Sequence, residues 1–177
     1  MIGVLVSGEG TNLQALIDAG LPIAAVASNR AGVAALERAD AAGIPSRVFD
    51  IATYADRSAR DRELADWLQL RGVDLVVLAG YMHLLTPAFL ERFPDRIVNV
   101  HPSLLPAFPG ARAVEDALTA GVDTTGVTIH YVDEGLDTGA VIRQEPVPVE
   151  PRATLLERIR EVEHRLLPDV VRELCAH

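Results

Sequence analysis

The first hundred residues alternate short apolar runs with stretches of helical spacing, and this alternation constrains the fold more than any other feature. The apolar runs have the length and composition of buried strands, and they lie at residues 2–6, 23–27, 48–49, 74–79 and 97–100. Helices are expected between them, at residues 13–17, 33–42 and 56–70, with a loop or short helix at 87–93. This order predicts an α/β fold, namely a Rossmann-like, mostly parallel twisted sheet with helices on both faces.

The sequence changes in character after His101. Residues 101–110 contain three prolines, which predict a stiff, shaped loop because each proline fixes its own φ and restricts the preceding residue. The elements expected beyond it are a helix at 113–120, longer strands at 125–132 and 140–149, and a final helix at 153–174 that Pro168 should kink or split. We therefore expect one domain over residues 1–177, with a Rossmann-like, phosphate-binding half at 1–100 and a catalytic half at 101–177.

The charged residues exclude several classes of chemistry. All 16 basic residues of the 177-residue chain are arginines, so lysine nucleophiles, Schiff bases and the Walker lysine are excluded. With 25 acidic residues the net charge is −9, which argues against nucleic-acid and membrane partners. The single cysteine, Cys175, cannot form an internal disulfide, and the N-terminus does not resemble a signal peptide. We expect a cytoplasmic protein.

A glycine-rich turn at residues 7–12 follows the first expected strand. Such a turn directs backbone N–H groups outward at a helix N-terminus, which favours binding of an anion. A dinucleotide fingerprint would need a third glycine where Leu13 stands and an acidic residue near Asn29, so NAD is disfavoured. Binding of NADP through Arg30 stays open, as does a plain tight turn with Thr11 or Asn12 as the helix cap.

Two further segments carry polar side chains suited to catalysis. Asn99 and His101 are two residues apart in an expected strand, so their side chains share a face at the ligand-binding edge of the sheet. The acidic turn at 133–139 could fold Asp137 back onto His101, which would orient the ring and raise the pKa of the imidazole. The alternatives are that Asn99 and His101 bind loop backbone and that the acidic turn is a solvated surface.

A metal site is not expected. His83, His101, His130 and Asp137 lack the spacing of known metal-ligand motifs, and no cysteine pair is present. His130 lies in an apolar strand, where it would be a core residue or a support for the site.

Four motifs together resemble those of the formyltransferase superfamily. They are Val-Ser-Gly-x-Gly-Thr-Asn-Leu-Gln at 6–14, Leu-Ala-Gly-Tyr-Met at 78–82, Asn-Val-His-Pro-Ser-Leu-Leu-Pro-Ala-Phe-Pro-Gly at 99–110, and Gly-Val-Thr-Ile-His-Tyr-Val-Asp-Glu-Gly-Leu-Asp-Thr-Gly at 126–139. The first motif narrows the resemblance to the folate-dependent phosphoribosylglycinamide formyltransferases of purine synthesis and the related formyltetrahydrofolate deformylases. The deformylases normally carry an extra N-terminal domain, and methionyl-tRNA formyltransferases a further C-terminal one; neither is expected here.

The resemblance implies a role for each matching residue. It assigns catalysis to Asn99, His101 and Asp137, and binding of a ribose phosphate to Gly10, Thr11 and Asn12. It assigns folate binding to Arg57, Met82, His83, Leu84, Leu85, Asn99, Asp133 and Glu134. Glu163 resembles a glutamate near the substrate amine. Position 83 is often arginine in relatives, so its histidine is a departure from the pattern.

The implied reaction moves the formyl group of the co-substrate 10-formyltetrahydrofolate to the amine of glycinamide ribonucleotide. The products are N-formylglycinamide ribonucleotide and tetrahydrofolate, in de novo purine (IMP) biosynthesis. The implied partners are these two small molecules alone, with no metal, and the enzyme would be a monomer or homodimer. The alternatives are a deformylase-like hydrolase, an NADP-linked reductase and a non-catalytic ligand-sensing module.

Overall fold

The computed structural model describes residues 1–177, which divide into two compact units, Met1–Val98 and Asn99–His177. The boundary lies close to the one expected between the two halves of the sequence. That the two units act as one domain stays a prediction.

The first unit is built on a parallel sheet. Its strands are β1 (Ile2–Val6), β2 (Ile23–Ser28), β3 (Ser46–Val48), β4 (Leu75–Leu78) and the beginning of β5 (Ile97–His101), in the order β3-β2-β1-β4-β5. Strand β1 pairs in parallel with both β2 and β4, and β2 pairs in parallel with β3. Every residue of β1 and β4 is buried, as expected for central strands that are covered on both faces.

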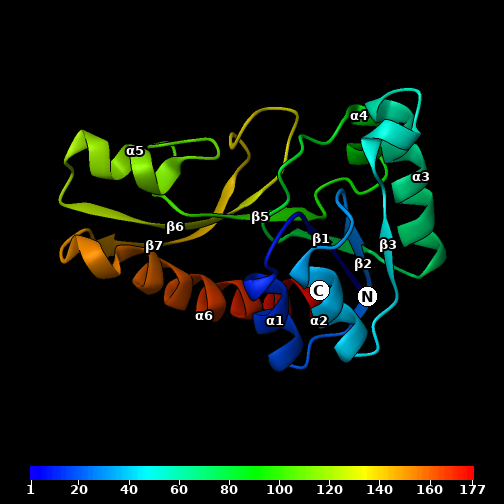
Figure 1. The fold of residues 1–177 in the computed structure, drawn as a ribbon, viewed down its shortest axis with the longest axis horizontal. Helices are drawn as coiled ribbons and strands as arrows, with labels where there is room; N and C mark the ends of the chain where they lie inside the picture. Colours follow the sequence, from blue (N-terminus) through cyan, green and yellow to red (C-terminus); the bar gives the residue numbers. More distant parts are fainter. The chain divides into compact units, whose positions relative to one another are not determined.

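Helices connect these strands. They are α1 (Thr11–Asp18), α2 (Ala34–Ala41), α3 (Arg57–Leu70) and the short α4 (Pro87–Leu90), with a 3₁₀ turn at Ile51–Thr53. Asp56 caps α3 by accepting a hydrogen bond from the Ala59 amide at 2.7 Å, which explains where this helix begins. Helices α1 and α2 pack against each other, and α3 packs against α4 (Figure 1).

The second unit contains the end of β5 and an antiparallel pair, β6 (Thr124–Tyr131) and β7 (Val141–Pro148). Helix α5 (Ala113–Ala120) precedes β6, and a 3₁₀ turn at Arg152–Thr154 leads into α6 (Leu155–Cys175). Helix α6 runs along β6 and β7 and packs against both (Figure 1). The site residues of this unit lie at the end of β5 and in the loop between β6 and β7.

The predicted strand–helix order is confirmed, with one correction in α6. Pro168 does not split this helix, which is continuous from Leu155 to Cys175. The reason is packing: Leu166, Leu167 and Val170 are buried on either side of the proline, so their contacts hold the helix together where one backbone hydrogen bond is missing. No helix in the chain combines the length and apolar character needed to cross a membrane.

Candidate active site

The glycine turn of the first unit places Gly10 at the N-cap of α1. Gly10 has φ +74°, and a Cβ at this position would lie 2.6 Å from the Cβ of Ala35, so both conformation and space require glycine. No side chain caps the helix, so the alternative of Thr11 or Asn12 as its cap is wrong. The first amides of an α-helix have no partner within the helix itself, so this N-terminus is suited to an anion.

Arg38 of α2 supports this turn, a role that no local sequence pattern indicates. Its Nε donates to the Glu9 carbonyl at 2.8 Å, and its Nη1 donates to Gln14 Oε1 at 3.3 Å. The contact joins residues 29 apart in the sequence, beyond the reach of any local pattern. Arg38 therefore fixes the turn and adds positive charge beside it.

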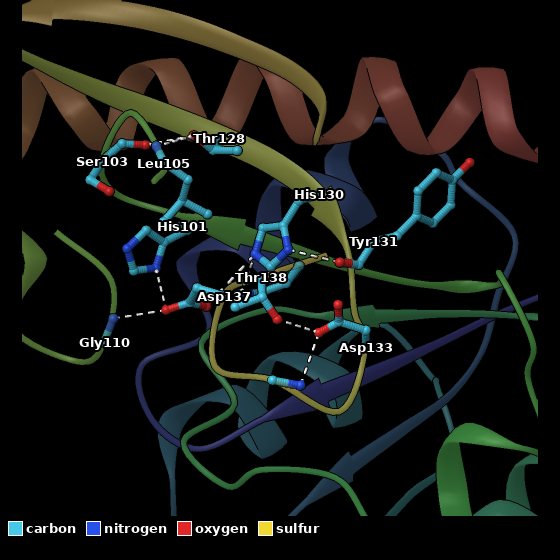
Figure 2. Close-up of polar contacts among 12 residues, drawn as sticks. His101, Ser103, Leu105, Gly110, Thr128, His130, Tyr131, Asp133, Asp137 and Thr138 are labelled. Atoms are coloured by element: carbon cyan, nitrogen blue, oxygen red, sulfur yellow. Dashed lines mark hydrogen bonds and ion pairs between the residues drawn. The ribbon is translucent and has the colours of Figure 1, made fainter. Parts of the chain in front are cut away.

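In the second unit, two histidine side chains converge on the Asp137 carboxylate. Asp137 Oδ2 lies 3.5 Å from His101 Nδ1, and Oδ1 lies 3.7 Å from His130 Nε2. Figure 2 shows the same Asp137 oxygen in contact with the His101 ring and the Gly110 amide, and the His130 ring beside the carboxylate. Asn99 Nδ2 reaches the same cluster, 3.2 Å from His130 Nε2. Asn99, His101 and Asp137 therefore belong to one connected cluster, and Asp137 lies against His101 as its turn was expected to allow.

The loop backbone holds Asp137 in place. Its Oδ2 accepts a hydrogen bond from the Gly110 amide at 2.8 Å, its side chain is only 10% exposed, and its φ is +54°. A non-glycine residue in this left-handed region is uncommon and is seen where surrounding contacts hold it. Asp137 is thus positioned by the proline-rich loop as well as by its own turn.

Both ring nitrogens of His101 face oxygen acceptors. Nε2 donates to the Phe108 carbonyl at 2.8 Å, and Nδ1 faces the Asp137 carboxylate. A cationic imidazole carries an N–H at each position, so this arrangement suits the charged form. Because Nε2 is already bound, donation from this atom to a reacting oxygen requires that the Phe108 hydrogen bond be exchanged.

His130 supports Asn99. Its Nδ1 must donate to the Tyr131 carbonyl at 2.8 Å, which leaves Nε2 of the neutral ring to accept from Asn99 Nδ2. Burial lowers the pKa of His130, against the opposing effect of the hydrogen bond to Tyr131, so the ring stays neutral. Sequence reasoning expected a core or supporting histidine here, and the contact fixes which way the Asn99 amide points.

The acidic turn at 133–139 is braced from within. Asp133 Oδ1 accepts from the Gly135 amide at 2.9 Å and from Thr138 Oγ1 at 2.6 Å (Figure 2). A Cβ on Gly139 would lie 1.7 Å from the Tyr131 carbonyl oxygen, so only glycine fits there. Asp133 therefore shapes the turn that carries Asp137, while Glu134 is exposed.

No three or more His, Cys, Asp or Glu side chains are arranged to hold a metal ion. The expectation that the reaction uses no metal stays a prediction.

A sequence model of the formyl transferase family matches residues 1–171 of the chain. The chain belongs to the formyl transferase family.

Individual formyl transferases match over nearly the whole chain. A phosphoribosylglycinamide formyltransferase of Haemophilus influenzae is 43% identical over 97% of this chain and 85% of its own length. The crystal structure of glycinamide ribonucleotide transformylase 1 from Symbiobacterium toebii is 48% identical, with a TM-score of 0.94 over 97% of this chain and 85% of that one. The trifunctional purine biosynthetic protein adenosine-3 of Chironomus tentans is 46% identical over 97% of this chain. The matched region makes up only 13% of the length of that larger protein.

The segment of this formyl transferase expected to bind folate lies in the first unit. Met82 and Leu84 expose 64% and 51% of their surface, whereas Leu85 is buried. The charge of Arg57, the first residue of α3, acts on His83 and Tyr81, so Arg57 lies near this segment. Exposed apolar side chains beside an arginine suit a flat heterocycle that carries acidic groups.

The His83 side chain is bound within the formyl transferase itself. Its two ring nitrogens lie 2.6 Å from Arg60 Nη1 and 3.2 Å from Asn29 Nδ2. Burial, the charge of Arg60 and that of Arg57 lower the pKa of His83, so this ring is no substitute for an arginine cation. In the second unit, Glu163 is buried on α6.

Proposed function

We propose that this chain transfers the formyl group of 10-formyltetrahydrofolate to the amine of glycinamide ribonucleotide, in purine biosynthesis. Membership of the formyl transferase family and the names of its relatives support the reaction. The observation that carries the proposal is the cluster in which Asp137 contacts His101 and His130 while His130 binds Asn99. We also propose that the enzyme works in the cytoplasm as a monomer or homodimer, with these small molecules as its only partners.

The proposed chemistry needs no covalent enzyme intermediate. The amine of glycinamide ribonucleotide attacks the formyl carbon, so that a new C–N bond forms and the carbonyl oxygen gains negative charge. The tetrahedral intermediate then collapses, the bond to N10 of the folate breaks, and the proton lost by the amine passes to N10. The chain therefore has two tasks, which are to stabilise the oxygen and to move the proton.

Asn99 and His101 stabilise the oxygen in this mechanism. The contact with His130 orients the Asn99 amide, and one oxyanion donor is typically worth about 3–4 kcal/mol of barrier. His101 in its charged form supplies a second N–H, after exchange of its bond to Phe108. The cost of this exchange is small because the new acceptor carries a negative charge.

Asp137 holds the charge on His101 and carries the proton. Its carboxylate lies 3.5 Å from His101 Nδ1, where a negative charge favours the imidazolium. We propose that the same carboxylate, directly or through water, relays the proton from the amine to N10. General acid–base catalysis of this kind typically accelerates a reaction by a factor of about 10²–10⁴.

The remaining assignments concern substrate binding. We propose that the amides of Gly10, Thr11 and Asn12 bind the ribose phosphate and that Glu163 interacts with the substrate amine. Folate binding is assigned to Arg57, to the segment Met82–Leu85 (Met82, His83, Leu84, Leu85), to Asn99, and to Asp133 and Glu134. The uncapped N-terminus of α1 and the exposed Met82 and Leu84 support the phosphate and folate assignments.

A direct assay tests the proposed function. Purified protein is mixed with 10-formyltetrahydrofolate with and without glycinamide ribonucleotide, and both tetrahydrofolate and the formylated product are measured. Transfer predicts equal amounts of the two products and almost no tetrahydrofolate when the ribonucleotide is omitted. Tetrahydrofolate released at the same rate without the ribonucleotide would instead establish a deformylase, in which water replaces the amine.

A further inference from the structure

Arg60 is a fully buried cation in an unfavourable place. It lies in the first turn of α3, where the helix dipole repels positive charge, and none of its surface is exposed. Its Nη2 lies 2.8 Å from Asp61 Oδ1 and its Nε donates to the same oxygen at 2.9 Å, with Asp61 also fully buried. Burying such a pair costs free energy and adds little net stability, so fold stability does not explain why it is here.

The third nitrogen of the guanidinium contacts His83. Arg60 Nη1 lies 2.6 Å from His83 Nδ1. Because a guanidinium in a protein only donates, Nδ1 must be the acceptor, and the proton of the neutral ring must be on Nε2. Arg60 thus determines the tautomer of His83 and disfavours its protonation.

The other side of the ring faces Asn29. The Asn29 atom 3.2 Å from His83 Nε2 is placed as Nδ2, while Oδ1 of the same carboxamide contacts Ser7 Oγ. Exchanging the nearly isosteric N and O of this amide lets the oxygen accept the Nε2 proton and the NH₂ group donate to Ser7 Oγ. Asn29 in turn hydrogen-bonds to Ser7, and Ser7 Oγ accepts from the Met82 amide at 2.9 Å. A continuous set of contacts therefore runs from Arg60 through His83 and Asn29 to the main chain of Met82.

The same ion pair holds the other end of the segment. Asp61 Oδ2 accepts from both the amide and the hydroxyl of Thr86, each at 2.8 Å. The Arg60–Asp61 pair therefore fixes residues 82–86 at both ends, through His83 at one and Thr86 at the other. Met82 and Leu84 lie between these anchors with their side chains exposed.

We propose that Arg60 is a positioning residue for folate, which acts by binding His83 Nδ1 and so holding the main chain of the segment Met82–Leu85 ready for the ligand. This inference rests on the proposed function, because it assumes that the segment binds the pteridine. Arg60 itself has no exposed atom with which to touch a ligand. Its effect is on folate affinity, and the reacting groups of the second unit do not depend on it.

The charges around His83 agree with this role. Burial lowers the pKa of His83 most, the charges of Arg60 and Arg57 lower it further, and the carboxylates of Asp61 and Asp50 oppose them only in part. The neutral ring is therefore favoured over the charged one more strongly than in a free histidine, whose pKa is about 6.5. Loss of Arg60 removes one of these charges and frees Nδ1 to take up a proton.

The first test compares Arg60→Met with Arg62→Met, a matched control on the exposed face of the same helix. We expect Arg60→Met to raise the KM for 10-formyltetrahydrofolate about tenfold, the effect of about 1.4 kcal/mol, and to leave kcat and the KM for glycinamide ribonucleotide within twofold. Arg62→Met should match the wild type in all three. Equal KM values in the two variants, or a fall in kcat alone, would overturn the proposal.

The second test uses pH and a double-mutant cycle. In Arg60→Met the KM for folate should rise as pH falls through about 6.5, while the wild-type KM stays flat, because only the variant protonates His83. His83→Ala should raise the same KM, and the double variant should be no worse than the worse single variant, because both changes break one contact. Additive effects would show that Arg60 acts independently of His83.

A spectroscopic measurement keeps the proposal testable should Arg60→Met fail to fold. Nitrogen NMR of the wild-type protein should find His83 as the neutral Nε2–H tautomer throughout pH 5.5–8. A proton on Nδ1, or titration near the ordinary value, would overturn the inference without reference to activity. Conversely, a wild-type protein with this tautomer but no formyl transfer would contradict the proposed function and leave the contact between Arg60 and His83 intact.

Discussion

The two units offer ligands different kinds of group. In the first unit the candidate binding elements include main chain, in the turn at Gly10 and the segment Met82–Leu85, and buried or bracing side chains such as Arg38 and Arg60 hold that main chain in place. In the second unit the candidate groups are side chains, and the loop backbone holds them. Ligand binding by the first unit should therefore be sensitive to substitutions that change backbone geometry. Catalysis by the second unit should be sensitive to substitutions that change the chemical group of a side chain.

Two histidines make the same contrast. His83 Nδ1 faces the Arg60 guanidinium, which only donates, whereas both nitrogens of His101 face oxygen atoms, of Phe108 and Asp137. The first environment favours a neutral ring that supports structure, and the second favours a charged ring that can donate to a reacting oxygen. The neighbours, more than the residue type, decide what each histidine does.

The largest effect is expected from Asp137→Asn. The amide keeps the size of the side chain but removes the charge that favours the His101 imidazolium, so kcat should fall by roughly 10²–10⁴. Steady-state kinetics with saturating substrates provides the measurement. Asp116→Asn, an exposed change on α5, is the matched control and should leave kcat unchanged. Wild-type turnover in Asp137→Asn would remove the side-chain mechanism of the second unit.

Gly10→Ala tests whether ligand binding by the first unit depends on the backbone conformation of the glycine turn. Its φ of +74° and the 2.6 Å between an added Cβ and the Cβ of Ala35 mean that alanine must distort the turn, at a cost of about 1–2 kcal/mol from the conformation alone. The KM for glycinamide ribonucleotide should rise about tenfold or more, and thermal unfolding should occur at a lower temperature.

Gly8→Ala is the control for this turn, because nothing lies within 4 Å of a Cβ placed there. It should leave the KM and the unfolding temperature close to wild type. If Gly8→Ala and Gly10→Ala raised the KM equally, the specific geometry at Gly10 would not be the cause.

The smallest effect concerns stability at acid pH. The pKa of His130 is lowered by burial, so below the unfolded value of about 6.5 the unfolded chain binds more protons than the folded one. The free energy of unfolding should therefore fall as pH drops from 7 to 5, by at most about 1.4 kcal/mol per pH unit for this group. Urea unfolding measured from pH 7 to 5 should show that the free energy of unfolding changes less with pH in His130→Asn than in the wild type. The same change with pH in both proteins would contradict a buried neutral ring.

Much of the fold could be predicted because its signals are local. Apolar runs such as Ile2–Val6 are buried strands, and Ala113–Ala120 begins and ends as expected. Pro168 was the exception, because its local preference for a break is outweighed by packing of α6. Asn99 and His101 could be paired from strand periodicity, and Asp137 from the charge and bend of its turn.

The sequence by itself determined the order of strands and helices, the glycine at position 10 and the residue types available for catalysis, since each depends on neighbours along the chain. Tertiary structure alone decided that Arg38 braces the glycine turn, that His130 orients Asn99 and that Arg60 binds His83. These contacts join residues 23 to 31 positions apart in the sequence. A side chain's charge state and hydrogen-bond role are set by the atoms that folding brings within about 3 Å, and no local pattern encodes those atoms.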